Sequence, residues 1–159
     1  MGLVFVGIAV ADQPSTAVLA TATLNATTKS NARTHTCGSV ENTKATYTGS
    51  ADSLESALKG SLSIRVNSTF NTATHLGTLR GHWTIDTSAP GNTGGTLAAV
   101  NNNGTITGWL EGRAPGGKKV AGTFSGSWSK DGGFSSLQIG TSSSSNVLVV
   151  TSGHCNEKG

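Results

Sequence analysis

The stretch Leu79-Arg80-Gly81-His82-Trp83-Thr84-Ile85-Asp86 alternates between two kinds of residue. Hydrophobic or small residues occupy every second position from Leu79 onward, and polar residues stand between them. Successive side chains of a β-strand point to opposite faces of a sheet. The stretch therefore predicts a strand with one buried face and one wetted face, which is typical of antiparallel sheets.

The same alternation recurs along the chain, at residues 60–66 and 120–128. Asn103-Gly104 and Asp131-Gly132 are strong signals for tight hairpins between such strands. We therefore expect an all-β fold, an antiparallel β-sandwich or barrel of about 9–11 strands that includes an apolar N-terminal strand. The candidate strands of the body are residues 16–26, 33–40, 44–50, 60–69, 76–86, 95–101, 105–112, 118–130, 134–140 and 146–152.

The composition agrees with many short strands. Charged residues make up 12% of the 159 residues, about half of the usual ~25%. Ser, Thr, Asn and 22 glycines supply the polarity, which disfavours long helices. A helical turn or two is expected only at residues 53–59, capped by Asp52 or Ser53.

The net charge of +3 and the pI near 9.1 raise the question of a nucleic-acid partner. The basic residues are scattered along the sequence, and Lys118-Lys119 is their only adjacent pair. No stripe of aromatic and arginine residues accompanies them, so we expect no nucleic-acid partner.

The first eleven residues are uncharged and apolar on both faces of a would-be strand. They are too short to cross a bilayer as a helix, so no membrane span is expected. Ala9-Val10-Ala11 has the look of a signal cleavage site, but no Lys or Arg precedes the run, and a structural strand is favoured. We divide the chain into a donor-type strand (residues 1–11), a hinge (12–15) and one β-domain (16–159).

Cys37 and Cys155 are the two cysteines, and most of the chain lies between them. In an oxidising compartment they form one disulfide, which indicates an extracellular or cell-surface protein. The alternative is a zinc site that combines both thiols with His35 and His154. Those spacings are not the ones that zinc fingers use, so the disulfide is favoured and no metal is expected.

Catalytic candidates are few. The eight carboxylates are thinly spread, and Glu111 is the best single one because it lies two residues after Trp109. His82 and Asp86 share a strand face but stand about 13 Å apart along it. No nucleophile elbow, phosphate loop or dinucleotide motif occurs, so we expect neither an enzyme nor a cofactor.

A short internal repeat with the pattern Gly-Thr-apolar-x-Gly precedes each of Trp83, Trp109 and Trp128. Large rings beside inward glycines are typical of a core, which we favour over a sugar-stacking platform. Three sequons mark possible glycosylation at Asn25, Asn67 and Asn103.

In architecture, the apolar N-terminal strand, the hinge with its proline and the β-domain resemble subunits of pili assembled by donor-strand complementation. The resemblance implies a structural subunit of an extracellular homopolymeric filament, whose partners are copies of itself joined head to tail. The side chains expected to enter the next subunit are Leu3, Val4, Phe5, Val6, Ile8 and Val10.

Two alternatives remain open. One is a self-contained secreted β-barrel that binds a small apolar or carbohydrate ligand and uses the N-terminal segment as its own strand. The other, weaker alternative is a small hydrolase that uses Glu111 or His82.

Deletion of residues 1–11 separates the first two hypotheses. The filament hypothesis expects a soluble, folded monomer that no longer elongates, because the missing strand completes another copy. Electron microscopy and size-exclusion chromatography check this outcome. An unfolded or aggregated product instead indicates that the segment belongs to its own domain.

Overall fold

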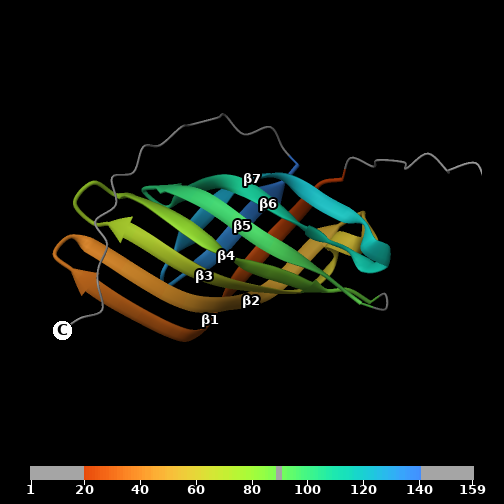
Figure 1. The fold of residues 1–159 in the computed structure, drawn as a ribbon, viewed down its shortest axis with the longest axis horizontal. Helices are drawn as coiled ribbons and strands as arrows, with labels where there is room; N and C mark the ends of the chain where they lie inside the picture. The colour runs from red at the N-terminus through yellow and green to blue at the C-terminus, as the bar shows by residue number, and fades with distance from the viewer. Residues whose placement is uncertain (1–19, 89–90, 141–159) are drawn as a thin grey trace, which may run out of the picture.

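The computed structural model describes residues 20–88 and 91–140. They form eight antiparallel strands that close into a barrel in sequence order (Figure 1). The prediction of an all-β antiparallel fold is confirmed. Of the two predicted architectures, sandwich and barrel, the structure is a barrel. The elements are β1 (Ala22–Cys37), β2 (Val40–Ser53), η1 (Ser56–Leu58), β3 (Gly60–Asn71), β4 (Leu76–Asp86), β5 (Asn92–Asn102), β6 (Thr105–Arg113), η2 (Pro115–Gly117), β7 (Lys119–Ser129) and β8 (Gly133–Ile139).

The strand count differs from the prediction because two expected strands are one. Residues 16–26 and 33–40 were predicted as separate strands, whereas β1 runs from Ala22 to Cys37. Its pairing with β2 shifts register between Ala26 and Thr28 and between Ser30 and Arg33. Such irregularities let a strand continue through a polar, twisted segment. The strand predicted at residues 146–152 and the donor-type segment lie outside the described residues.

The barrel closes where β1 meets β8. Ala22 pairs with Ile139, and Leu24 pairs with Leu137. These pairs complete the ring of strands within the described residues. Beyond Ala26, β1 pairs only with β2, whereas β2 continues to pair with β3 as far as Val40, so the distal half of β1 is an edge of the described sheet.

Side chains fill the barrel interior, as expected for eight strands. Trp83 is buried, and its Nε1 donates a hydrogen bond of 3.1 Å to the Thr96 carbonyl oxygen. Trp128 is also buried, so the core prediction is confirmed for these two tryptophans. It is wrong for Trp109, whose side chain lies outside the barrel and is 48% exposed.

The turns follow the sequence signals with one adjustment. Asn103 and Gly104 join β5 to β6 with φ values of 52° and 90°, the left-handed pair that a tight hairpin requires. The expected helical turn is the single 3-10 turn η1. Its N-cap is Glu55, whose Oε1 accepts a hydrogen bond from the Ala57 N–H, and not Asp52 or Ser53.

Close strand contact explains one inward glycine. A Cβ atom at Gly95 would overlap the Glu111 carbonyl oxygen and the Gly112 Cα of the neighbouring strand. At Gly122, also within a strand, the nearest atom to an added Cβ is the Ile139 Cγ2 at 3.7 Å, an ordinary contact. Closure of the sheet therefore requires glycine at position 95 and not at 122.

We predict that Gly95→Ala lowers the free energy of unfolding by about 1–3 kcal/mol, because backbone of β6 must move to admit the methyl group. Gly122→Ala is the matched control and should stay within ~0.5 kcal/mol of the wild type. Denaturant unfolding of the two variants measures the difference. Equal stability of the two variants would contradict the packing argument.

Candidate functional site

A hollow of about 1200 Å³ lies on the outer face of the barrel. It crosses β2 to β6 and extends to the distal half of β1. A barrel sheet has the shape of a hyperboloid, so its outer surface can be concave along one direction. We call this hollow the outer groove. Its charged and aromatic lining residues are Arg33, Lys44, Arg65, Arg80, His82, Trp109 and Glu111.

Strand register brings these residues together from distant parts of the chain. Two adjacent rows of outward side chains cross the strands. The first row consists of Arg33, Lys44, Asn67, Arg80, Ala98 and Trp109, each opposite the next. The second row consists of Thr46, Arg65, His82, Thr96 and Glu111.

The cations of the outer groove have no carboxylate partner within the described part of the chain. The ion pairs found there join Lys29 to Asp131, Lys59 to Asp52 and Lys130 to Glu41, all outside the groove. Arg33 and Lys44 stand directly opposite each other on β1 and β2. Like charges in that position destabilise a sheet, and an anion bound between them would relieve the repulsion.

Trp109 presents an uncovered indole to the outer groove. It stands opposite Ala98 on β5 and Thr123 on β7, and both side chains are small. A signal for this position exists in the sequence. Ile106 and Leu110 are the buried residues of β6, and Trp109 has the opposite parity.

The clustering of basic residues escaped the sequence analysis, which treated them as scattered. Three of the chain's four arginines line the outer groove. They come from three different strands and are separated by 15 or more residues. One sequence signal for the cluster exists. Arg65, Arg80 and His82 have outward parity in strands that alternate, so they lie on the same face of the sheet.

The two catalytic candidates lie in the groove but do not form an acid–base pair. His82 and Glu111 occupy the same row with Thr96 between them, which separates their Cα atoms by about 10 Å, two strand spacings. Asp86 lies farther along the strand of His82, as the sequence indicated. The two rows of side chains are suited to contact a ligand at several points. That the protein is not an enzyme stays a prediction.

The other predicted sites divide between described and undescribed residues. Asn67 lines the outer groove, Asn103 lies in the β5–β6 turn, and the Oδ1 of Asn25 accepts a hydrogen bond from the Ser136 N–H at 2.8 Å. Glycosylation of these sequons stays a prediction. Cys37 ends β1, whereas Cys155, His154 and the donor-type residues lie outside the described part, so the disulfide also stays a prediction. Among residues 20–88 and 91–140, no three His, Cys, Asp or Glu side chains are grouped to hold a metal ion.

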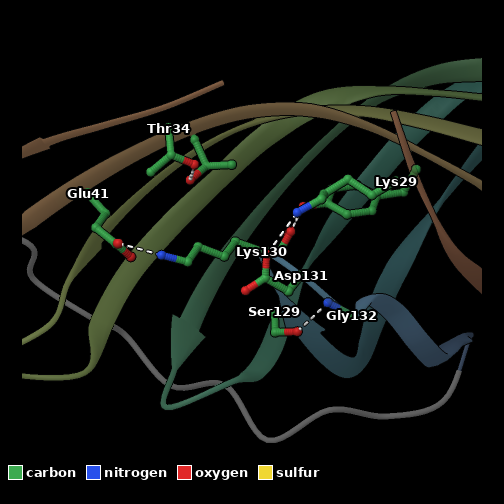
Figure 2. A network of polar contacts seen from close by, with 9 residues as sticks. Lys29, Thr34, Glu41, Ser129, Lys130, Asp131 and Gly132 are labelled. Carbon is green, nitrogen blue, oxygen red and sulfur yellow. Dashed lines mark hydrogen bonds and ion pairs between the residues drawn. The ribbon is translucent and has the colours of Figure 1, made fainter. Parts of the chain in front are cut away.

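One mouth of the barrel is bridged by polar contacts (Figure 2). The Lys29 Nζ lies 2.8 Å from the Asp131 Oδ1, and the Lys130 Nζ lies 2.6 Å from the Glu41 Oε2. The Tyr47 hydroxyl donates a 2.7 Å hydrogen bond to the Lys130 carbonyl oxygen. The β7–β8 turn is thereby tied to β1 and β2.

These contacts shift the protonation of the groups involved. The hydrogen bond from Lys29 lowers the pKa of Asp131, and the hydrogen bond to Glu41 raises the pKa of Lys130. Burial, helped by the charge of Asp131, raises the pKa of Tyr47 to about 12. Tyr47 also packs edge-on against Phe134, with ring centroids 5.5 Å apart.

Comparison with protein-family models, curated proteins and solved structures finds no match for this chain. In the described segments, no helix has the length and hydropathy needed to span a membrane. The residues of the outer groove are therefore the basis of the functional argument.

The titration of Tyr47 tests the bridged mouth of the barrel. Because the chain has one tyrosine, its tyrosinate absorbance reports on Tyr47 alone. We expect a midpoint near 12 in the folded protein and near 10.0 in denaturant. The raised pKa favours the neutral phenol in the folded state, so its contribution to stability is complete below about pH 10 and is lost as the pH rises toward 12.

Asp131→Asn serves as the comparison variant for this titration. It removes a charge that raises the pKa of Tyr47, so its midpoint should fall below that of the wild type. A folded wild-type protein that titrates near 10.0 would show that Tyr47 is not held as described.

Proposed function

We propose that this protein is a self-contained β-barrel binding module whose outer groove binds an anionic polymer outside the cell. One observation carries the proposal. Four cationic side chains meet in a hollow that also exposes Trp109, and none of the four has a carboxylate partner among the described residues.

Electrostatics favours an anion in the outer groove. Arg33, Lys44, Arg65 and Arg80 provide four positive charges, and Glu111 is the one carboxylate among the residues that line the hollow. A cleft lined by one sign of charge focuses the field and raises the local concentration of counter-ions. Arginine also presents a planar fork of donors that fits carboxylate, sulfate or phosphate oxygens.

The interior of the barrel is a less suitable site. Trp83, Phe124 and Phe134 fill it and are at most 1% exposed. The β7–β8 turn is held by the hydrogen bond from the buried Tyr47 to the Lys130 carbonyl oxygen and by the ion pair between Lys130 and Glu41. A small apolar ligand inside the barrel would have to displace this packing, whereas the outer groove is open to solvent.

The filament hypothesis stays a prediction, because residues 3–11 lie outside the described part of the chain. Donor-strand complementation completes a sheet that lacks a strand. The sheet described here already closes between β1 and β8, and for this reason we favour the binding module. The extracellular location rests on the predicted disulfide between Cys37 and Cys155.

Substitution of two groove arginines tests the proposal. We expect Arg65→Gln combined with Arg80→Gln to weaken binding of dextran sulfate by roughly thirtyfold, at about 1 kcal/mol for each exposed charge contact. Isothermal titration at low ionic strength measures the affinity. Added salt should weaken binding by the wild type more steeply than binding by the double variant.

Arg113→Gln is the matched control. Arg113 is an exposed arginine on β6 that does not line the outer groove, so its loss should leave the affinity within about twofold of the wild type. If Arg113→Gln weakens binding by about fivefold, which is the share of one charge in the roughly thirtyfold loss of the double variant, the interaction reflects net charge and the proposal is wrong.

A further inference from the structure

A second hollow, of about 420 Å³, lies on the outer face of β1 to β4. Its polar lining consists of hydroxyl groups and one carboxylate, from Thr28, Thr48, Ser61, Ser63, Thr84 and Asp86. We call it the hydroxyl hollow. It faces the same side of the sheet as the outer groove, because its polar lining residues have outward parity.

The two hollows are neighbours along three strands. Thr48, Ser63 and Thr84 form one row, in which each residue pairs with the next. Each of them is two residues along its strand from a member of the second row of the outer groove. Side chains two apart on a strand share a face and stand about 7 Å apart. The outer groove and the hydroxyl hollow therefore form one continuous surface.

The length of this surface suits a chain-like ligand. On β4 it runs from Arg80 in the outer groove to Asp86 in the hydroxyl hollow. Six steps of about 3.3 Å give roughly 20 Å along this strand alone. The first row adds the distance from Arg80 to Trp109, two strand spacings or about 10 Å. A single small molecule does not reach both ends.

The chemistry of the surface fits a ligand that carries hydroxyl groups as well as charge. Hydroxyl side chains donate and accept, whereas Glu111 and Asp86 only accept. These carboxylates accept hydrogen bonds from sugar hydroxyls, of which a polysaccharide carries several on each ring. Trp109 is the one Phe, Tyr or Trp side chain among the residues that line the two hollows. Single-stranded nucleic acids usually require aromatic side chains on which successive bases stack.

We infer that the ligand is a linear acidic polysaccharide that occupies the outer groove and the hydroxyl hollow together, an inference that rests on the anion binding proposed above. Its acidic groups lie over the four groove cations, and one sugar ring packs against the indole of Trp109. Beyond the cations, sugar hydroxyls form hydrogen bonds with Thr48, Ser63 and Thr84.

Heparin oligosaccharides of increasing length provide the probe. In the wild-type full chain, affinity should rise with length until both hollows are filled. Thr48→Val combined with Thr84→Val removes two hydroxyls while it keeps the shape and strand preference of the side chains. We expect this double variant to bind the longest oligosaccharides about tenfold more weakly and the shortest binding ones unchanged.

Thr105→Val is the matched control, because Thr105 is exposed on β6 and lines neither hollow. It should bind every length as the wild type does. Indole fluorescence gives a second readout, since Trp83 and Trp128 are buried and Trp109 is not. In Trp109→Phe the fluorescence change on binding should be lost while the affinity is retained. Trp109→Ala should lose affinity as well.

Three results would overturn the inference and leave the proposed anion binding intact. The first is an affinity for long oligosaccharides that the Thr48→Val, Thr84→Val variant does not change. The second is tighter binding of an oligothymidylate than of a heparin oligosaccharide of equal charge, which would identify a nucleic-acid site. The third is binding of inorganic polyphosphate, which has no sugar ring, with the same affinity as heparin. Failure of all these polyanions to bind would instead defeat the proposed function itself.

Discussion

The pairing of β1 with β8 is the constraint on which the rest of the structure depends. It joins the first and last strands of the described sheet through residues such as Ala22 and Ile139. Where the two strands pair, closure removes the unpaired edges that an open sheet would present. It also separates every strand into inward and outward side chains around one axis. The packed interior and the outer groove are two consequences of this single ring.

The interior and the outer face have opposite effects on stability. Burial of Trp83, Tyr47, Phe124 and Phe134 supplies the apolar area that holds the barrel together. The outer groove places like charges side by side, and Arg33 and Lys44 face each other with no ion pair to a carboxylate of the described segments. A surface that is locally unfavourable in the free protein is typical of binding sites, because a complementary ligand removes the repulsion.

Strands with one wetted and one buried face were predictable from local sequence. The expected strand at residues 76–86 coincides with β4 (Leu76–Asp86), because its alternation is strict and both ends carry turn residues. The bounds of β1 were not predictable in this way, because residues 27–36 are all exposed and show no hydrophobic period. Trp109 was assigned to the core on its glycine-rich setting, although its parity in β6 places it outside. Parity was the better guide in this case, because it follows directly from backbone geometry.

By itself the sequence determined the strand-rich class, most strand positions, the hairpin turns and the buried face of the strands that alternate. These features depend on residues close together in the chain. Only the tertiary structure decided the number of strands in the ring and the neighbours of each outward side chain. Arg33, Lys44, Arg65 and Arg80 meet because four strands pair in a particular register. That register is set by the closed core as a whole. Local sequence therefore could not predict that these four cations share one surface.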